Sequence, residues 1–335
     1  MKQKKTLWIL LAAAVLILAA VLLFKLAAQP EAPAPEAPAE TAEAPAEAAE
    51  AAVAEEAVPS EAGISVTDME GRTITLEKPA EKIVALTAAE VEILYAIGAG
   101  DALVGRGEFC NFPAECMNVP AISSGRETNL ESVLALNPDL VIMGSMDQSE
   151  EQVEALEKAG AVVAVTDADT LEGVYEAIAL VGTLTGHDPE AGALIESMKN
   201  TFAGLSAKVP EGAAPTVYFE VSPLEWGLWA AGANTFMDEI AQMLSMENIF
   251  SDLQGWKEVS QEQILDRNPD YIVTTTMYFG EGPTPVEEVM GRTGWDTVTA
   301  VMDNQVFNAD SDAITRPGPR LAEAATALFD FVYGG

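Results

Sequence analysis

The chain has 335 residues, and its 53 acidic against 17 basic side chains give a formal net charge of −36. This excess of negative charge argues against nucleic acid as a partner, because binding to phosphates needs a basic surface. It also disfavours long-range attraction of a free anionic ligand. A single histidine leaves almost no Ser-His-Asp or zinc hydrolase option, so we expect no enzyme.

Residues 1–28 form a predicted membrane segment. Lysines 2, 4 and 5 precede an unbroken apolar run, Leu7–Phe24, which Lys25 closes. At about 1.5 Å per residue this run nearly matches a bilayer core of about 30 Å. The basic cluster predicts that the N-terminal side stays in the cytoplasm and that the rest is exported. A cleaved signal peptide is the alternative, although such a peptide usually has a shorter apolar region and an Ala-x-Ala-like end. We therefore expect an extracytoplasmic protein, tethered by this anchor or secreted if the segment is cleaved.

Residues 29–62 are almost wholly Ala, Pro and Glu. Such a stretch cannot bury a core, and its glutamates repel one another, so we expect an extended, solvated spacer. The remaining residues suffice for two core-forming units. We predict an N-terminal α/β lobe over 63–170, connecting helices over 171–210 and a C-terminal α/β lobe over 211–335.

In the first lobe, short β-rich runs alternate with helical stretches, which is typical of an α/β fold with largely parallel sheets. In chain order we expect a hairpin over 66–76, a strand over 83–86, a helix over 89–97 capped by Thr87, a strand over 103–105, a helix over 129–136, a strand over 140–143, a helix over 150–159 and a strand over 162–165.

Helix-period sequence then extends from 171 to about 208, interrupted only at Gly186–Pro189. This stretch is too long for one crossover helix, so we expect one helix on the first lobe and then a long helix that leads to the second. The elements expected after it are a strand over 216–221, helices over 235–244 and 261–266, a strand over 271–275, helices over 285–290 and 296–300, a strand over 306–307 and a helix over 320–332.

An internal repeat is the most informative feature of the sequence. Asn129–Ile142 aligns without a gap on Ser260–Val273, and each copy has a polar N-cap, a glutamate in the first turn and an Asn-Pro-Asp stop before a strand. Glu131 and Glu262 could simply compensate the helix dipole. As equivalent carboxylates on two lobes, they would also form a symmetric pair of contact points for a two-fold partner.

The two cysteines and the histidine have local interpretations. Cys110 and Cys116 could form a disulfide in an oxidising compartment or remain two free thiols. Two cysteines and one distant histidine do not make a closed zinc site, and we expect no metal bound by the protein itself. His187 stands beside the break in the helical region, which favours a capping or surface role over haem ligation. Axial ligation by Tyr278, Met277 or Met146 stays open.

From about Val66 to its C-terminus the chain resembles the iron-siderophore and cobalamin (Fe/B12) class of substrate-binding proteins of ABC importers. The segments that carry the resemblance are Ile83–Thr87, Asn129–Asp139, Trp256–Glu262 and Ile314–Arg320. The resemblance implies two Rossmann-like lobes joined by a long rigid helix, the class III type of periplasmic binding protein. It further implies that Glu131 and Glu262 meet arginines of a permease dimer, which works with its ATPase. We expect a monomer without an intrinsic cofactor, whose ligand is an iron chelate, cobalamin or haem.

Candidate ligand contacts follow from the strand ends, because ligands of open α/β sheets sit beyond the carboxyl ends of the strands. On the first lobe the candidates are Thr87, Ala88, Phe109, Asn111, Phe112, Ser145 and Met146. On the second they are Glu225, Trp226, Trp229, Met277, Tyr278, Phe279 and Arg316. The aromatic members suit a flat macrocycle or an aromatic siderophore, although any one of them could instead belong to the core.

The leading hypothesis is therefore a receptor that delivers a metal complex to an ABC permease. A sensor or adhesion module that uses the same fold is one alternative. An extracytoplasmic hydrolase is the other.

Overall fold

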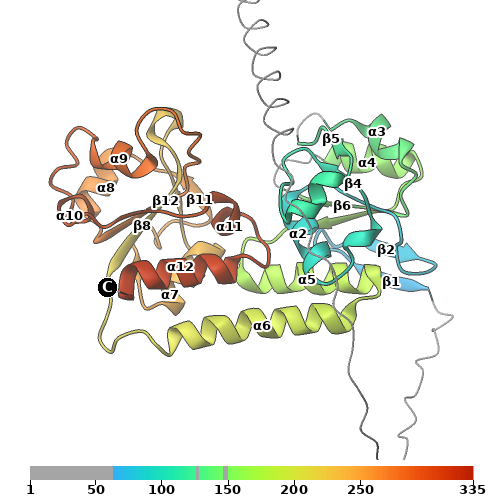
Figure 1. The fold of residues 1–335 in the computed structure, drawn as a ribbon, viewed down its shortest axis with the longest axis horizontal. Helices are drawn as coiled ribbons and strands as arrows, with labels where there is room; N and C mark the ends of the chain where they lie inside the picture. Colours follow the sequence, from blue (N-terminus) through green and yellow to red (C-terminus); the bar gives the residue numbers. More distant parts are fainter. Residues whose placement is uncertain (1–62, 126–127, 146–149, 335) are drawn as a thin grey trace, which may run out of the picture. The chain divides into compact units, whose positions relative to one another are not determined.

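The computed structural model describes residues 63–334 except 126–127 and 146–149 (Figure 1). Its first sheet is wholly parallel, with strand order β5-β4-β3-β6-β7. The strands are β3 (Ile83–Ala85), β4 (Leu103–Gly107), β5 (Ala121–Ile122), β6 (Leu140–Gly144) and β7 (Val163–Thr166). An antiparallel hairpin of β1 (Ile64–Thr67) and β2 (Thr73–Leu76) precedes them. Since all five sheet strands run in one direction, their carboxyl ends share one edge.

The second sheet has the order β11-β9-β8-β12-β13, and β10 pairs with β8. Its parallel strands are β8 (Thr216–Ser222), β10 (Glu247–Asn248), β12 (Tyr271–Thr274) and β13 (Val306–Asn308). The short strands β9 (Trp229–Ala231) and β11 (Trp256–Glu258) extend it in antiparallel pairing. Because of this extension, Trp229 and Trp256 lie on the adjacent strands β9 and β11 at one edge of the sheet.

Helices cover the first sheet and connect it to the second. The first-lobe helices are α2 (Ala88–Ala96), α3 (Leu130–Ala135) and α4 (Glu150–Lys158), with 3₁₀ turns η1 (Gly100–Ala102) and η2 (Ala114–Asn118). The connecting helices are α5 (Leu171–Thr185) and α6 (Asp188–Ser206). Gly186 ends α5 in the left-handed conformation, φ 72°, and a proline in its first turn starts α6. The break in the helical region is therefore a glycine C-cap followed by a proline start, as the sequence predicts.

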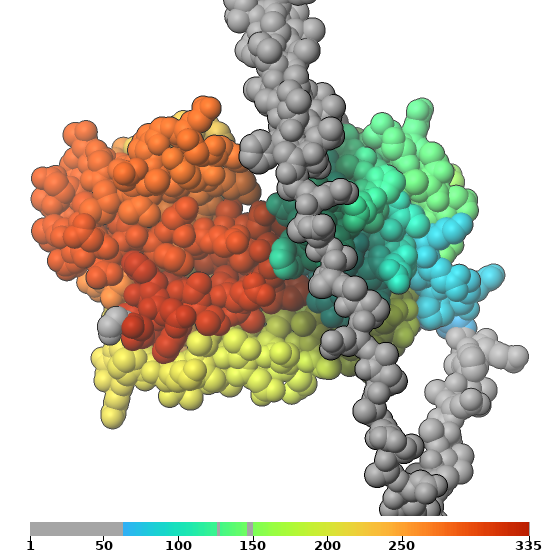
Figure 2. All heavy atoms as spheres, in the orientation of Figure 1, coloured from blue at the N-terminus to red at the C-terminus, as the bar shows by residue number. Residues whose placement is uncertain are grey.

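The second lobe carries shorter helices and one long closing helix. They are η3 (Leu224–Trp226), α7 (Phe236–Met243), α8 (Gln261–Arg267), α9 (Pro285–Met290), α10 (Thr299–Met302), α11 (Ser311–Thr315) and α12 (Leu321–Tyr333). The closing helix α12 packs along α6, and in Figure 2 its red atoms lie directly on the yellow atoms of α6. The long connecting helix thus contacts elements of both lobes, because it also packs against α5.

The two copies of the repeat have the same local structure. Asn137 and Asn268 end α3 and α8 in the left-handed region, φ 47° and 44°. The aspartate after each proline then fastens the neighbouring strand: Asp139 accepts from the backbone N–H groups that precede β3, and Asp270 accepts from Thr216 N–H at the start of β8. The Asn-Pro-Asp pattern is therefore a helix stop and a strand anchor in one.

The apolar core is continuous from one lobe to the other. One buried cluster runs from the first sheet through α5 and α6 into the second sheet, including Ile83, Phe202 and Phe219. Separate clusters fill the outer face of each sheet, around Val141 in the first lobe and Trp295 in the second. The two-lobed α/β class is confirmed, while the lobe boundaries at 63, 171 and 211 stay predictions.

Some local predictions were wrong. The helix expected over 296–300 begins only at Thr299, because Val298 is extended, with ψ 130°, and its N–H closes a turn onto the Trp295 carbonyl. Thr87 precedes α2 but does not cap it, since its hydroxyl donates to Glu90. The short strands β5, β9, β10 and β11 and helix α11 were not predicted. Within the described residues no helix is both long and apolar enough to span a membrane, and the predicted anchor and spacer, residues 1–62, lie outside them.

Candidate functional site

A cavity of about 440 Å³ lies between strand ends of the first lobe and loops of the second. Thr87 follows β3, Gly144 and Ser145 end β6, and Thr166 ends β7, so one wall consists of the carboxyl edge of the first sheet. The opposite wall includes Trp256 and the Thr315–Pro317 segment. The cavity is therefore at the place where open α/β sheets bind ligands.

A second cavity, of about 360 Å³, adjoins the first, because Trp256 and Thr315 line both. Its other lining residues are Val221 and Ser222 at the end of β8, and Trp229 in β9. We call the two cavities together the cleft. Its second-lobe side offers two indole faces, and its first-lobe side offers hydroxyls and backbone groups.

A buried carboxyl group holds the first-lobe wall in place. The Glu90 side chain on α2 accepts hydrogen bonds from the hydroxyls of Thr87 and Thr166, and the residue is 2% exposed. The Thr87 oxygen in turn accepts from Gly144 N–H at 2.7 Å. One glutamate therefore links the ends of β3, β6 and β7, and sequence reasoning missed it because it looked like an ordinary acidic residue in a first helical turn.

Asp169, which follows β7, connects this wall to the second lobe. Its carboxylate accepts from Trp256 Nε1 at 3.0 Å, and its carbonyl accepts from Phe236 N–H at 2.6 Å. The Trp256 ring also packs on the Phe236 ring, with centroids 5.3 Å apart. Trp256 is thus held in a fixed orientation in the cleft. The sequence signal for it was its place in one of the segments that carry the family resemblance.

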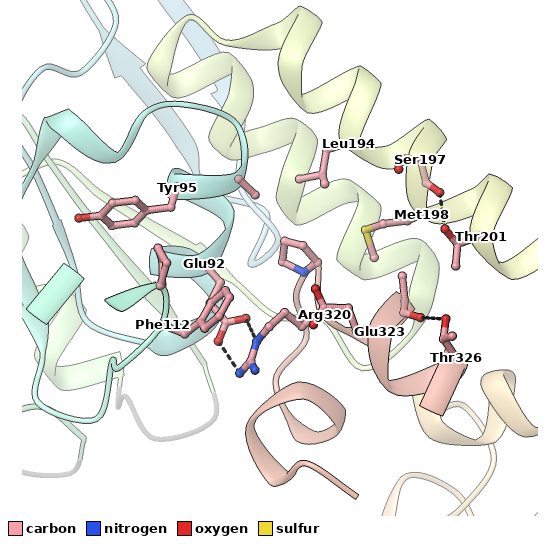
Figure 3. Close-up of a pocket in the computed structure, with 14 residues that line it drawn as sticks. Glu92, Tyr95, Phe112, Leu194, Ser197, Met198, Thr201, Arg320, Glu323 and Thr326 are labelled. Carbon is pink, nitrogen blue, oxygen red and sulfur yellow. Dashed lines mark hydrogen bonds and ion pairs between the residues drawn. The ribbon is translucent and has the colours of Figure 1, made fainter. Parts of the chain in front are cut away.

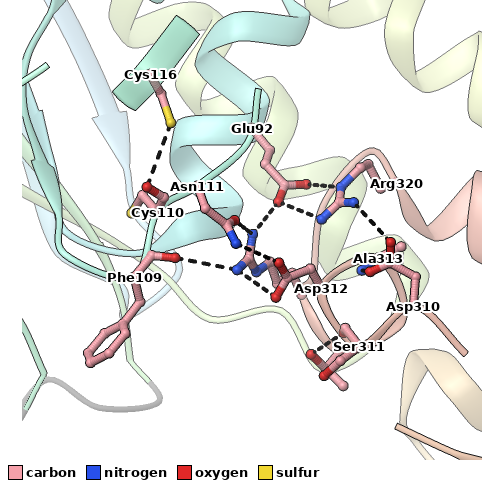
Figure 4. A network of polar contacts seen from close by, with 12 residues as sticks. Glu92, Phe109, Cys110, Asn111, Cys116, Asp310, Ser311, Asp312, Ala313 and Arg320 are labelled. Atoms are coloured by element: carbon pink, nitrogen blue, oxygen red, sulfur yellow. Dashed lines mark hydrogen bonds and ion pairs between the residues drawn. The ribbon is translucent and has the colours of Figure 1, made fainter. Parts of the chain in front are cut away.

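A polar network joins the lobes on the other side of the cleft (Figure 4). Glu92 on α2, 2% exposed, accepts from Arg316 at 2.8 Å and from Arg320 at 3.0 and 3.2 Å. Asn111 accepts from Arg316 at 2.8 Å and donates to Asp312 at 2.8 Å. We call these five residues the inter-lobe network. It places two arginines of the second lobe on a single buried carboxylate of the first.

The guanidinium group of Arg316 has its hydrogen-bond and ion-pair partners within the protein. Besides Glu92 and Asn111, that group pairs with Asp312 at 2.7 Å and donates to the Phe109 carbonyl at 3.4 Å. Burial alone would lower the pKa of Arg320, but its hydrogen bonds to Glu92 raise it. Both guanidinium groups therefore pair with carboxylates of the protein itself.

The predicted ligand contacts divide into four groups. Those that line the cleft are Thr87, Ala88, Phe109, Ser145, Arg316 and Trp229. Those that lie outside the lining of these cavities are Glu225, Trp226, Met277, Tyr278 and Phe279, of which Phe279 is 85% and Trp226 77% exposed. Met146 lies outside the described residues. Asn111 belongs to the inter-lobe network, and Phe112 stacks on Arg320, with the guanidinium carbon 4.3 Å from the ring centroid.

Phe112 also lines a third cavity, of about 600 Å³, between α2, α6 and α12 (Figure 3). The charged side chains buried at this cavity, Glu92 and Arg320, bond to each other. Its remaining wall consists largely of helix surfaces such as Met198 and Thr201. It is larger than either cavity of the cleft taken singly, but none of its lining residues lies at a strand end, so the cleft is the better candidate site.

Glu131 and Glu262 are both exposed in the first turns of α3 and α8. Their helices have matching positions, since α3 leads into β6 beside β3, and α8 leads into β12 beside β8. Side-chain caps start both helices, from Asn129 and Ser260. The two carboxylates therefore project from equivalent points of the two lobes, as the repeat predicts.

Cys110 and Cys116 are buried free thiols, the second of the two alternatives. The Cys116 thiol lies 3.7 Å from the Cys110 carbonyl oxygen (Figure 4). Arg106 donates to the carbonyls of Cys110 and Cys116 at 2.8 and 3.0 Å, which holds the loop closed. Burial raises the pKa of the Cys110 thiol to about 12, so this thiol is protonated near neutral pH.

The described residues contain no group of three or more His, Cys, Asp or Glu side chains suited to hold a metal ion. His187 makes a local contact, with its Nδ1 2.9 Å from the Thr185 carbonyl at the break between α5 and α6. His187 is not among the residues that line the cleft, and it occupies the N-cap position of α6, although its side chain makes no capping hydrogen bond.

Comparison with known proteins agrees with this architecture. The family model described as periplasmic binding protein matches residues 83–313. The chain is 33% identical over 276 residues to the uncharacterized ABC transporter substrate-binding lipoprotein YvrC of Bacillus subtilis, covering 81% of this chain and 85% of that protein. It is 28% identical over 268 residues to a cobalamin-binding protein of Halobacterium salinarum, covering 78% and 71% of the two chains.

Among solved structures, a possible iron-binding (periplasmic solute-binding) protein of Staphylococcus epidermidis matches with a TM-score of 0.67 and 28% identity. The match covers 76% of this chain and all of that one. Two lobes with a cleft at the carboxyl edge of a parallel sheet, together with these matches, lead to one assignment: the chain belongs to the periplasmic binding protein family.

Proposed function

We propose that this protein captures cobalamin or an iron complex, a siderophore or haem, in the cleft and delivers it to an ABC import permease. The observation that carries the proposal is the cleft itself, with the Trp229 and Trp256 faces opposite the strand ends of the first lobe. Large apolar faces and a few fixed polar groups suit a large ring or chelate. The names of the relatives point the same way, since one is a cobalamin-binding protein and another a possible iron-binding protein.

Within the cleft, the indoles of Trp229 and Trp256 bind the apolar face of the ligand, and Thr87 and Ser145 supply polar contacts. The exposed aromatics Trp226, Tyr278 and Phe279 form an outer rim that contacts a ligand larger than the cavities. The protein itself performs no catalysis and carries no intrinsic cofactor.

Delivery uses the two exposed glutamates. Glu131 and Glu262 pair with arginines of the two halves of a permease dimer, because charge-assisted Arg–carboxylate pairs form and release readily at an exposed interface. The protein is a monomer, and it acts outside the cytoplasm, as its family does. Residues 1–28 tether it to the membrane. YvrC is named a lipoprotein, but both cysteines of this chain lie in the folded region, at 110 and 116.

Two experiments test the two halves of this proposal. Native mass spectrometry of the full chain with cyanocobalamin, a ferric hydroxamate and haem should give a 1:1 complex with at least one of them. Absence of any complex would contradict the capture half.

For the delivery half, the Glu131→Ala/Glu262→Ala variant should bind ligand normally but lose permease-dependent uptake. A matched control, Glu196→Ala/Glu323→Ala, removes two exposed carboxylates from α6 and α12. Uptake that persists in the first variant would exclude docking through these glutamates, whereas an absence of uptake with the wild-type protein would favour a sensor or adhesion role.

A further inference from the structure

The cleft is lined by more acidic than basic side chains. Glu90, Asp167 and Asp169 line it, whereas Arg316 is the one cationic side chain among its described lining residues. Glu90 is buried, but Asp167 and Asp169 are exposed at the end of β7. A ligand that enters the cleft therefore meets two solvent-accessible carboxylates.

The positive charge of Arg316 is not free for a ligand. Its guanidinium pairs with Glu92 at 2.8 Å and with Asp312 at 2.7 Å, and the side chain is only 14% exposed. A ligand anion would have to compete with two carboxylates that are already in place. The arginine therefore holds the lobes together and contributes little net positive potential to the cleft.

Lys257 of the second lobe directly follows the cleft residue Trp256 in the sequence, but its side chain points away from the cleft. It lies in β11 between Trp256 and Glu258, and successive side chains of a strand point to opposite faces. Since Trp256 faces the cleft, Lys257 faces away from it. Strand β11 thus contributes an indole and no cation to the lining of the cleft.

The two exposed carboxylates are fixed as acceptors. Asp167 accepts from the Ser145 hydroxyl, and Asp169 accepts from Trp256 Nε1. Each therefore presents oxygen to the cleft at a held position, where ligand N–H groups could donate to it. An anionic group at the same place would lose its hydration next to a like charge, which is unfavourable.

We infer that the cleft selects large complexes of zero or positive net charge that bear N–H donors, and discriminates against polyanionic ones. Asp167 and Asp169 are the residues that determine this specificity. The inference rests on the proposed function, since it assumes that the ligand enters this cleft.

The test uses pairs of ligands that differ chiefly in charge. Cyanocobalamin is compared with its tricarboxylic acid, made by hydrolysis of three side-chain amides, and a neutral ferric trihydroxamate with a ferric tricatecholate. Each ligand is titrated into the full chain, and binding is followed by tryptophan fluorescence. In whichever pair binds, the anionic ligand should bind at least tenfold more weakly than the neutral one. Equal or tighter binding of the anionic member would overturn the inference while leaving the proposed function intact. Binding of neither haem nor any of these four ligands would defeat the proposed function itself.

Isosteric variants locate the effect. Asp167→Asn/Asp169→Asn keeps an acceptor oxygen at both sites and should strengthen binding of the anionic member at least fivefold, while the neutral member changes less than threefold. Glu196→Gln on α6 is the matched control and should change neither. If the double variant leaves the anionic affinity unchanged, these aspartates do not determine specificity.

Arg126 follows the cleft residue Gly125 in the sequence and lies outside the described residues. Arg126→Gln should preserve the preference for the neutral member. If wild type prefers the anionic member and this variant removes that preference, the inference is overturned and Arg126 supplies the charge.

Discussion

Replacement of Glu92 by glutamine tests how much the inter-lobe network stabilises the protein. The carboxylate accepts three hydrogen bonds from two arginines, at 2.8, 3.0 and 3.2 Å, and is almost fully buried. Glutamine has the same shape, but its amide N–H₂ would face guanidinium donors, and two buried cations would lose their shared counter-ion. Removal of one partner from a buried ion pair typically costs about 3–5 kcal/mol.

Urea denaturation of the full chain, followed by tryptophan fluorescence, measures the effect. With a slope of about 3 kcal/mol per molar urea, the unfolding midpoint of Glu92→Gln should fall by about 1 M or more. Glu323→Gln is a suitable control, because Glu323 is an exposed glutamate on α12, one turn from Arg320. A Glu92→Gln midpoint within about 0.2 M of this control would refute the view that the network is a major tie between the lobes.

Two further variants or treatments probe the cleft and its loop. Glu90 accepts from two hydroxyls at the ends of β3 and β7, so Glu90→Gln should lose one charge-assisted hydrogen bond and about 1.5–3 kcal/mol of unfolding free energy. The same variant should weaken ligand binding more than tenfold. Unchanged ligand affinity would show that this carboxyl group does not shape the first-lobe wall of the cleft. Because burial raises the pKa of Cys110 to about 12, its reaction with iodoacetamide in the folded protein should be slow at pH 8 and should accelerate about tenfold per pH unit as the thiolate forms. In urea two thiols should react with Ellman's reagent. If no thiol reacts, Cys110 and Cys116 form a disulfide.

Much of the architecture was readable from the sequence because its signals are local. Asn137 and Asn268 take the left-handed conformation that ends each repeat helix at its Asn-Pro-Asp stop. Gly186 ends α5 in the same local manner. Such features depend on a few adjacent residues, so the sequence alone predicts them.

The cleft was only partly readable, because its key contacts are long-range. Glu90 and Glu92 both lie on α2 and look like solvent-facing acidic residues, yet both are buried. What buries Glu92 is a pair of arginines from the end of the chain, and what satisfies Glu90 is a threonine from β7. No helical periodicity reveals such partners. Likewise, β9 and β11 have three residues each, too few for a strand pattern, so the position of Trp256 opposite the first sheet was not predicted.

A structure of the full chain with a bound ligand tests the central claim most directly. The ligand identified by native mass spectrometry should lie in the cleft, in contact with Trp256 on one side and with the Thr87–Ala88 strand end on the other. Density for the ligand in the cavity between α2, α6 and α12, or on the exposed rim alone, would contradict the account.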